Sequence, residues 1–253
     1  MPWNPARYEQ FAKERYAPFD DLARLIDVRP GMRVIDLGCG TGELTARLAD
    51  LLPESDVLGV DSSPEMLARA ESFARPGLRF ERGSVQEAAG EWDLVFSHAV
   101  IQWVDDHESL VPRLLSLVAP GGRLAVQQPS NFGHPTHLLI DEVASEAPFA
   151  AALDGRRRAW PVLGIERYAE LLYAAGATDI SVFEKVYPHV LDDADALADW
   201  MSGTALVPVF ERLPDELHEP FMERYSGRLH QRFPGRPVFF GFRRTLFVAT
   251  RPA

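Results

Sequence analysis

The stretch Val34-Ile35-Asp36-Leu37-Gly38-Cys39-Gly40-Thr41-Gly42 decides the fold. It runs from an apolar, strand-like segment into three alternating glycines, and residues with helical spacing follow over Glu43–Leu52. Glycine lets the backbone approach a ligand closely, and the first turn of a helix offers N–H groups that have no partner within the helix. The stretch therefore predicts a buried strand, a ligand-binding turn and a helix.

Outward from this turn, apolar runs alternate with helical stretches, which is typical of a parallel sheet covered by helices. Ser63 followed by Pro64 predicts a helix start, and Pro120-Gly121-Gly122 predicts the end of a helix and the start of the fifth strand. The expected strands are Arg33–Leu37, Asp56–Val60, Leu78–Glu81, Asp93–Ser97, Arg123–Gln127, Asp179–Tyr187 and Val238–Thr250. The expected helices are Glu43–Leu52, Pro64–Ala74, Ser109–Ala119, His137–Ala147, Glu166–Ala175, Ala194–Thr204 and Pro214–Phe233.

The alternation is interrupted after Gln128 and again over about residues 188–237, where proline-rich and helical segments take its place. We interpret the two interruptions as insertions that together form a helical lid. The prediction is a single domain over residues 1–253 with a core of about 20–128, 165–187 and 238–253. The lid is expected to comprise about 1–19, 129–164 and 188–237.

The composition is that of a globular protein of 253 residues, 46% apolar and 25% charged, with a formal net charge of −11. This charge disfavours nucleic acid as a partner, because a polyanion is normally met by a basic surface. The single cysteine, Cys39, fits a reducing compartment, and no run in the sequence has the length and apolarity of a bilayer-spanning helix. We therefore expect a cytoplasmic protein that binds neither nucleic acid nor membrane and holds no metal.

The charge is unevenly distributed along the chain. The last 27 residues carry +6, whereas the first 226 carry −17. In one interpretation a basic tail neutralises an acidic body; in the other, some of its arginines contact an anionic ligand. The arginines concerned are Arg228, Arg232, Arg236, Arg243, Arg244 and Arg251.

The glycine-rich turn can be compared with two kinds of ligand site. The dinucleotide fingerprint G-x-G-x-x-G needs a glycine where this chain has Glu43, whose carboxylate would face a pyrophosphate. An acidic residue before a G-x-G-x-G spacing suits a ligand that carries an ammonium group. Asp61, 21 residues beyond Gly40, ends the second expected strand, where a carboxylate can accept hydrogen bonds from a ribose diol. The turn therefore favours a nucleoside ligand without a pyrophosphate.

The glycine turn and the acid of the second strand resemble the class I S-adenosylmethionine-dependent methyltransferases over residues 30–128. This resemblance implies an α/β fold: a Rossmann-like seven-stranded sheet with helices on both faces. It also implies that Asp36 orients the methionine end of S-adenosylmethionine, Asp61 holds the ribose, Ser84 lies at the adenine edge and His98 lies near the sulfonium. The cofactor-binding residues that it implies are Asp36, Gly38, Cys39, Gly40, Asp61, Ser62, Met66, Ser84, Val85, Ser97 and His98.

Segments outside this region resemble the trans-aconitate 2-methyltransferases, which extends the likeness over almost the whole chain. The matching residues are Trp3-Asn4-Pro5, Tyr8, Phe11, Arg15, Pro18, Ile101-Gln102-Trp103, Asp106-His107, Ala125-Val126-Gln127, Pro129, Asn131, Pro135-Thr136-His137, Trp200, Gly203-Thr204, Phe242, Arg244 and Val248-Ala249-Thr250-Arg251. The chain departs from that pattern at Ser130, His134, Val207 and Arg243, where Asp, an acid, Arg and Pro are usual. The resemblance implies an enzyme that forms a methyl ester on a small polycarboxylic acid.

An acid substrate is consistent with the chemistry of the transfer. A carboxylate, with a pKa of about 4, is ionised at neutral pH, so no general base is required. The enzyme has to align oxygen, methyl and sulfur and to exclude water. Arginine suits this task because its planar fork holds a carboxylate through two hydrogen bonds. The residues expected to position the acid are Tyr8, Arg15, Trp103, His137 and Arg244, with Arg156–Arg158 and His134 as further donors and Phe11 and Trp200 as further aromatic walls.

Three alternatives stay open on the sequence. The first is methylation of another small metabolite at oxygen, nitrogen or carbon, for which His98 is a candidate base if the acceptor is an alcohol or amine. The second is a nicotinamide-dependent oxidoreductase, and the third is a cofactor-binding protein without catalytic activity. The oligomeric state is also open.

Overall fold

The computed structural model describes residues 13–155 and 160–253, with side chains described from residue 16 onward. The chain divides into two compact units. The sheet unit consists of Arg15–Pro129, Trp160–Lys185 and Arg244–Ala253, and the described part of the helical unit consists of residues 13–14, 130–155 and 186–243. That the core and lid form one folding domain stays a prediction.

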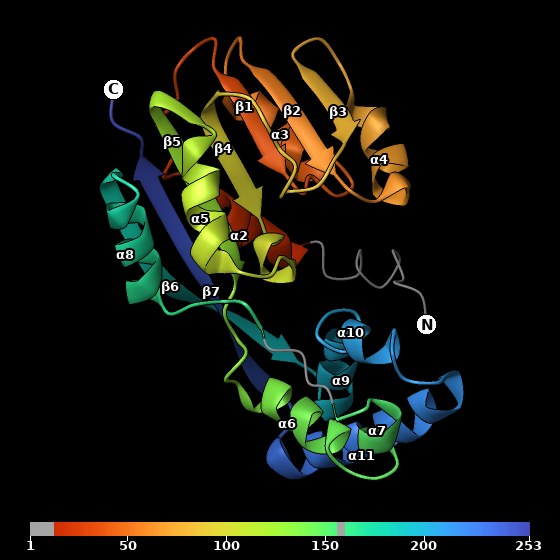
Figure 1. Ribbon diagram of the computed structural model, residues 1–253. Coiled ribbons are helices and arrows are strands. Elements are labelled where there is room, and N and C mark those ends of the chain that lie inside the picture. Colours follow the sequence, from red (N-terminus) through yellow and green to blue (C-terminus); the bar gives the residue numbers. More distant parts are fainter. Residues whose placement is uncertain (1–12, 156–159) are drawn as a thin grey trace. The chain divides into compact units, whose positions relative to one another are not determined.

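Seven strands form one mixed sheet in the order β3-β2-β1-β4-β5-β7-β6, which confirms the predicted α/β fold class (Figure 1). The strands β1 to β5 are parallel to one another, whereas β7 runs antiparallel to β5. Both β6 and β7 contribute residues to the sheet unit and to the helical unit. The strands are β1 Arg33–Leu37, β2 Asp56–Asp61, β3 Leu78–Arg82, β4 Trp92–His98, β5 Val118–Pro129, β6 Thr178–Leu191 and β7 Val238–Thr250.

Within the sheet unit, helices cover both faces of the sheet (Figure 1). One face, here called the α2 face, packs against α2 (Lys13–Ala23) and α3 (Glu43–Leu51). The opposite face, the α5 face, packs against α5 (His107–Ser116) and α8 (Ile165–Ala174). Successive residues of a strand point to opposite faces, so the buried strands carry apolar residues on both sides.

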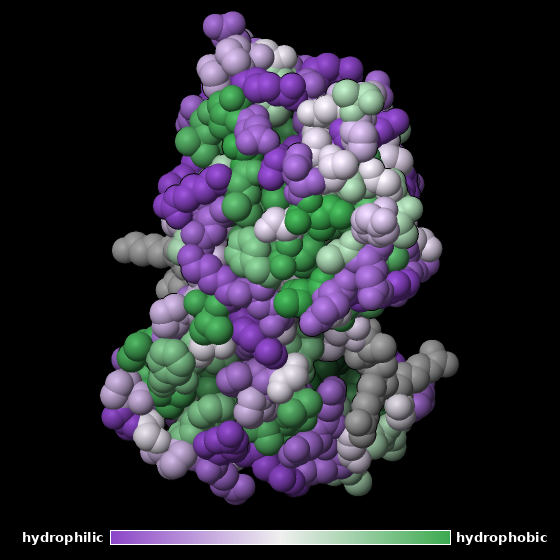
Figure 2. Space-filling model, turned by 90° about the vertical axis from the view of Figure 1, so that its left-hand side faces the viewer, coloured by the Kyte–Doolittle hydropathy of each residue, from purple (hydrophilic) through white to green (hydrophobic). Residues whose placement is uncertain are grey.

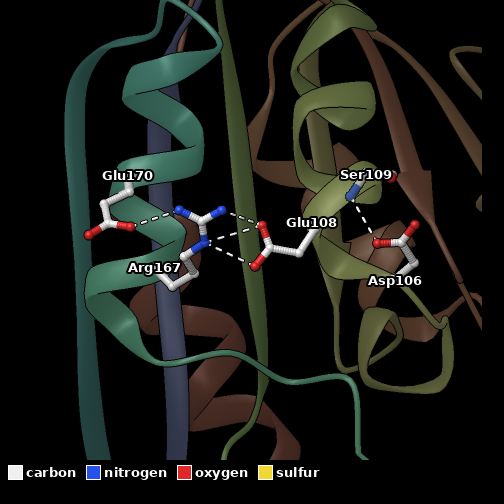
Figure 3. Close-up of polar contacts among 5 residues, drawn as sticks. All are labelled: Asp106, Glu108, Ser109, Arg167 and Glu170. Carbon is white, nitrogen blue, oxygen red and sulfur yellow. Dashed lines mark hydrogen bonds and ion pairs between the residues drawn. The ribbon is translucent and has the colours of Figure 1, made fainter.

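The α5 face is held by polar contacts as well as by apolar packing. Figure 3 shows Arg167 of α8 between Glu108 of α5 and Glu170 of its own helix. The Arg167 Nε and Nη2 atoms donate to the two Glu108 oxygens at 2.9 and 2.6 Å, which is the two-pronged geometry of a strong arginine–carboxylate pair. The Arg167 guanidinium accordingly lowers the pKa of Glu108. The pair joins two helices that lie side by side over the sheet.

A buried hydrogen-bond network lies beneath these helices on the α5 face. His107 Nε2 bonds to the Ile101 carbonyl at 2.8 Å, so it carries the proton and Nδ1 is left as an acceptor. The Tyr168 hydroxyl therefore donates to His107 Nδ1 at 2.6 Å, while it accepts from Gln128 Nε2 at 2.6 Å and from the Leu163 N–H at 3.0 Å. Burial raises the pKa of Tyr168 to about 12. This tyrosine network ties α5, α8 and β5 together.

Two expected element boundaries are wrong around β5. The helix expected at Ser109–Ala119 begins earlier, at His107, because Asp106 caps it by accepting the Ser109 N–H at 3.2 Å (Figure 3). Val118 already pairs with Trp92, and the ladder resumes with Arg123 opposite Leu94, so Pro120-Gly121-Gly122 forms an irregularity inside β5.

Other helix ends differ by a few residues from those expected. The helix expected at His137–Ala147 begins at Pro135, because His134 caps it and proline fits its first turn. The helix expected at Pro64–Ala74 ends at Ala70 and continues as a 3-10 turn. The remaining helices are α4 Pro64–Ala70, α6 Pro135–Ala144, α7 Phe149–Ala152, α9 Ala194–Ser202, α10 Val207–Phe210 and α11 His218–Arg232, and the 3-10 turns are Glu71–Phe73, Ile101–Trp103 and Asp215–Leu217.

The helical unit is organised around α11, which packs on α6 and α9. Phe221 of α11 stacks edge-on against Phe149 of α7, with ring centres 5.0 Å apart. The buried Tyr225 hydroxyl donates to the Thr136 carbonyl at 3.0 Å and so fastens α11 to the start of α6. In the part of the chain that the structure describes, no helix is long and apolar enough to cross a membrane.

The edge strand β6 exposes apolar side chains in the helical unit. Val186 and Val190 are 51% and 67% exposed, and Phe239 of the neighbouring β7 is 63% exposed. Figure 2 shows, on the side of the chain that carries α8, hydrophobic residues interspersed among hydrophilic ones. Exposed apolar residues of this kind are common on folded proteins.

Candidate active site

Gly38 and Gly40 of the turn after β1 differ in the space around them. Gly38 has φ +79°, and a Cβ built on it would lie 2.1 Å from the Val100 side chain, so no larger residue fits. Gly40 has φ +55°, and no described atom other than its chain neighbours lies within 4 Å of a Cβ built there. Gly38 is therefore required by packing, whereas Gly40 leaves space in which a ligand can approach the backbone.

Asp61 is held against this turn by backbone hydrogen bonds. Its Oδ2 accepts the Gly40 N–H at 2.9 Å, and its Oδ1 accepts the Ser63 N–H at 2.9 Å. The cap of α4 is supplied by Ser63, whose Oγ accepts the Met66 N–H at 3.3 Å, as Ser63-Pro64 predicts. Each Asp61 oxygen keeps a second lone pair, so the fixed carboxylate can still accept from a ribose diol.

Asp36 is a buried carboxyl with one satisfied oxygen. Only 4% of the residue is exposed, and Oδ2 accepts the Thr45 hydroxyl of α3 at 2.6 Å. Oδ1 is buried and has no hydrogen-bond partner among the residues that the structure describes. Burial raises the pKa of Asp36 to about 7, the Thr45 hydrogen bond opposes this rise and the nearby Asp61 adds to it. A cation beside Oδ1 would stabilise the ionised form, as the ammonium group of S-adenosylmethionine would do.

Ser84 and Val85, the two residues expected at the adenine edge, have different surroundings. The Ser84 hydroxyl donates to Glu87 Oε2 at 2.7 Å and accepts the Glu87 N–H at 3.3 Å, so most of its hydrogen-bonding capacity is already used. The Val85 side chain is 7% exposed and belongs to the apolar core of the α5 face. In the glycine turn, burial and the two nearby aspartates raise the pKa of the Cys39 thiol, which therefore stays protonated.

A row of polar side chains crosses the α2 face at the carboxyl end of β4 and β5. His98 lies directly opposite Gln127 in the β4–β5 ladder. Gln127 Oε1 accepts from Arg244 Nη1 of β7 at 3.0 Å. Phe96 lies two residues before His98 on β4, so its side chain points to the same face. Phe96 lies opposite Asp36 in the β1–β4 ladder. The structure thus brings His98 and Arg244 together with Gln127 on the face that also carries the Asp36 carboxyl.

His98, Gln127 and Arg244 are buried, which strengthens the electrostatic interactions of any charge among them. Arg244 is 6% exposed, His98 is 9% exposed and Gln127 is fully buried at 0%. The His98 ring meets the ring of Phe19 of α2 edge-on, with centres 6.0 Å apart. Ser97, the neighbour of His98, points to the other face and donates to the Leu37 carbonyl at 3.2 Å. A buried guanidinium interacts with an anion far more strongly than one in water does.

Among the other residues expected in the site, the structure describes Trp103, Trp200 and Ser62. Trp103 is 43% exposed and packs against Trp160, with ring centres 5.6 Å apart. Trp200 is buried in the helical unit against His189 and the β7 aromatic rings. Ser62 is exposed beside Asp61. Tyr8, Phe11, the Arg15 side chain and Arg156–Arg158 lie outside the described residues.

His137, another expected donor to the acid, belongs to α6 of the helical unit. It is 8% exposed, and its Nδ1 lies 3.2 Å from the Thr136 hydroxyl. Burial, helped by the neighbouring His134, lowers the pKa of His137 to about 3. The pKa of His134 is also lowered, mainly by burial and further by Arg243 and Arg232. Both rings are therefore neutral at pH 7, and any hydrogen bond that they donate lacks the strength of a charged one.

Three arginines of the basic C-terminal segment lie beside acidic residues. Arg228 bonds to Glu146, Arg236 lies 3.0 Å from Asp193, and Arg251 lies 3.7 Å from Glu91. These three neutralise acidic residues, as the first interpretation of the charge distribution expected. Arg244 donates to the Gln127 amide oxygen on the α2 face. Sequence analysis did not select Gln127 as a site residue, although its two-residue spacing from buried Ala125 marks it as a residue of the same face.

The fold and the glycine turn define a methyltransferase. A methyltransferase-domain family model matches residues 29–176, and the chain belongs to that family. The predicted class is therefore confirmed: the chain is an S-adenosylmethionine-dependent methyltransferase. Among its relatives, the chain is 48% identical to the trans-aconitate 2-methyltransferase of Deinococcus radiodurans, over 100% of this chain and 99% of that one. It is 38% identical to the trans-aconitate 2-methyltransferase of Variovorax paradoxus over the full length of both, so the chain belongs to the trans-aconitate 2-methyltransferase family.

Solved structures of lower sequence identity share the fold. The YcgJ protein from Bacillus subtilis aligns with a TM-score of 0.63 at 14% identity, over 94% of this chain and 99% of that one. Phosphoethanolamine N-methyltransferase 2 from Haemonchus contortus, in complex with S-adenosyl-L-methionine, aligns with a TM-score of 0.56 at 17% identity, over 94% of this chain and 53% of that one. These likenesses support the fold alone.

Proposed function

We propose that the protein transfers the methyl group of S-adenosylmethionine to a carboxylate of trans-aconitate and forms a methyl ester. The full-length relatives that carry this activity in their names support the substrate. The observation that carries the proposal is the burial of Arg244, whose guanidinium donates to Gln127 on the face that carries Asp36. A cation in that environment is suited to an anionic substrate.

The proposed roles follow from the geometry of the sheet unit. Asp36 faces the ammonium group of the cofactor, and Asp61, fixed by Gly40 and Ser63, holds the ribose. The open space beside Gly40 allows close approach of the ligand to the turn. Ser84 and Val85 contact the adenine edge, and His98 packs near the reacting centre. Tyr8, Arg15, Trp103 and His137 remain proposed positioning residues for the acid.

The chemistry requires alignment rather than proton transfer. S-adenosylmethionine supplies an electrophilic methyl group: a carboxylate lone pair forms the O–CH3 bond while the electron pair of the S–CH3 bond passes to sulfur. The sulfonium thus becomes a thioether and the reacting carboxylate becomes an uncharged ester group, while the other carboxylates keep their charge and no proton moves. Arg244 holds one carboxylate so that another oxygen of the acid lies in line with the methyl group. The apolar walls around the row exclude water and strengthen this interaction.

The direct test is incubation of the protein with methyl-labelled S-adenosylmethionine and a panel of di- and tricarboxylic acids that includes trans-aconitate. We expect labelled methyl ester with trans-aconitate and a kcat that is flat from about pH 6.5 to 8.5, because the carboxylate is ionised throughout. A kcat that rises with a pKa near 7 would point to a base such as His98 and to an alcohol or amine acceptor. Failure to esterify any acid of the panel would reject the proposed function.

A further inference from the structure

Helices α2 and α3 of the sheet unit contact each other through five polar and aromatic side chains. On α2, Phe19 and Asp20 lie three and four residues beyond Tyr16, so the three share one side of the helix. On α3, Glu43 and Arg47 are four residues apart and also share one side. These five residues, which we call the α2–α3 clamp, contact one another between the two helices.

Arg47 is the centre of the clamp. Its Nη2 atom lies 2.7 Å from Asp20 Oδ1. Its guanidinium carbon lies 5.2 Å from the centre of the Tyr16 ring and 5.7 Å from that of the Phe19 ring, distances at which a cation is attracted to an aromatic face. The Tyr16 hydroxyl in turn donates to Glu43 Oε1. A planar guanidinium suits this position, because it can pair with a carboxylate and lie over rings at the same time.

One end of the clamp belongs to the helix that starts at the glycine-rich turn. Glu43 is the first residue of α3 and directly follows Gly42 of that turn. Thr45, between the two clamp residues of α3, is buried and donates to the Asp36 carboxyl at 2.6 Å. The same stretch of helix thus contacts α2 on one side and, on the other, the carboxyl that we propose to face the cofactor.

The other end of the clamp reaches the carboxyl end of β4. Phe19 is fully buried, and its ring meets the rings of Phe96 and His98 edge-on, with centres 5.8 and 6.0 Å apart. His98 is the last residue of β4 and lies opposite Gln127 in the β4–β5 ladder. Because protein interiors are close-packed, a ring in such contact limits the orientations of its neighbour. Phe19 therefore restricts the His98 ring.

We propose that Arg47 is a positioning residue for the methyl transfer: it clamps α2 to α3, so that Phe19 holds the His98 ring at the end of β4. The catalytic part of this inference rests on the proposed function. A shift of about 1 Å in a supporting group can slow an aligned reaction by about 100-fold. The Arg47 and Asp20 side chains are 44% and 30% exposed, and an ion pair of that kind contributes little to stability. Loss of the clamp should therefore affect kcat more than the melting temperature.

A second arginine bound to α3 offers a matched control. Arg75 pairs with Asp50 of α3 and donates to the Ala46 carbonyl of the same helix at 3.2 Å. Its side chain is 40% exposed, close to the value for Arg47. The two arginines share residue type, exposure and a carboxylate partner, but Arg47 joins α3 to α2, whereas Arg75 joins α3 to the segment before β3.

The experiment compares Arg47→Met and Arg47→Lys with Arg75→Met. For each protein we would measure amide hydrogen exchange of α2 by mass spectrometry, the kcat and KM for trans-aconitate, the affinity for S-adenosylhomocysteine by calorimetry, and the melting temperature. Arg47→Met should make the α2 amides exchange about tenfold faster and should lower kcat about tenfold. Cofactor affinity should stay within about twofold and the melting temperature within about 3 °C.

The other two variants test the cause of these effects. Arg47→Lys keeps the charge beside Asp20 but not the planar group over the two rings, so its exchange rate and kcat should lie between those of Arg47→Met and the unmodified protein. Arg75→Met should leave both quantities within about twofold. An equal loss of kcat in Arg75→Met would assign the effect to α3 as a whole and would overturn the role of Arg47.

The outcomes separate this inference from the proposed function. If Arg47→Met leaves α2 exchange unchanged, the clamp is overturned. If α2 exchange rises while kcat stays the same, the positioning role is overturned; in both cases the proposed function stands, provided that the unmodified protein forms the ester. If the unmodified protein esterifies no acid of the panel, the proposed function and the positioning role are rejected together, and the exchange rates still decide whether Arg47 holds α2.

Discussion

The two faces of the sheet at β5 differ in how completely their polar side chains are hydrogen-bonded. On the α5 face, the Tyr168 hydroxyl uses its donor and both acceptor positions, and His107 bonds through both ring nitrogens. On the α2 face, Asp36 Oδ1 and Gln127 Nε2 are buried without hydrogen-bond partners among the described residues. The α5 face has one such atom in its tyrosine network, Gln128 Oε1, so the difference between the faces is one of degree.

This difference indicates what each face is for. A polar group whose hydrogen bonds are completed within the protein contributes to stability, because breaking them exposes a desolvated partner. A buried polar group with incomplete hydrogen bonds costs stability until a ligand completes them. We therefore expect substitutions on the α5 face to lower stability, and those on the α2 face to weaken ligand binding without lowering stability. Four predictions test this difference between the faces, in order of decreasing expected change in the free energy of unfolding or binding.

The largest effect is expected from Asp36→Asn. The folded protein holds this carboxyl with a pKa of about 7, against 3.8 for an ordinary aspartate, so between these values the folded state binds more protons than the unfolded state. The contribution of Asp36 therefore lowers stability as pH rises from about 4 to 7 and is constant above that. In the cofactor-free protein at pH 8, Asp36→Asn should raise the free energy of unfolding by about 4 kcal/mol. Denaturant titration of both proteins at several pH values measures the difference.

The same substitution should weaken cofactor binding. In the unmodified protein the affinity for S-adenosylmethionine should fall by up to about tenfold for each pH unit below 7, because Asp36 must lose its proton to face the ammonium group. Asp36→Asn should remove this dependence and lower the affinity at pH 8 by about tenfold. A variant that is both less stable and tighter in binding would contradict the assignment of Asp36 to the ligand.

The second prediction concerns Arg244. Arg244→Ala should raise the KM for trans-aconitate by about 100-fold, or about 2.7 kcal/mol, because a buried, charge-assisted contact with the carboxylate is lost. The KM for S-adenosylmethionine should change by no more than about twofold. Arg244→Lys is the matched control: it keeps the charge but not the planar fork, so its effect on the acid should be intermediate. Equal effects on both KM values would assign Arg244 to the structure.

The third prediction moves to the α5 face. Tyr168→Phe removes the hydroxyl that joins His107, Gln128 and the Leu163 N–H, so three buried partners lose a hydrogen bond. The free energy of unfolding should fall by about 2 kcal/mol, which lowers the melting temperature by about 6 °C in a chain of this size. Both KM values should stay within about twofold. A rise in the acid KM alone would show that the network acts on the site and would break the division between the faces.

The contrast between Gln127 and Gln128 also shows how far the sequence could predict the site. The glycine turn, Asp36 and Asp61 follow from local pattern, because a strand, a tight turn and a helix are consecutive in the chain. Two adjacent identical glutamines cannot be assigned to different roles until the β5–β7 register places Arg244 on the face of one of them. The start of α5 likewise depends on Asp106, which caps the helix from a left-handed conformation, φ +56°, that residues other than glycine adopt in only a few per cent of cases.

The smallest effect is expected from Ser84→Ala. This substitution tests whether a residue contributes to cofactor binding because of its position or because its hydrogen bonds are incomplete. Ser84 lies at the proposed adenine edge, but its hydroxyl already donates to Glu87 Oε2 and accepts the Glu87 N–H. If incomplete hydrogen bonding marks the functional residues, removal of this hydroxyl should lower cofactor affinity by less than about threefold, or about 0.7 kcal/mol, and should reduce stability by a similar amount through loss of the turn. Calorimetry with S-adenosylhomocysteine and thermal unfolding give the two values. A loss of tenfold or more in cofactor affinity without a change in stability would mean that position alone defines this site, and it would remove the main reason for assigning the two faces different roles.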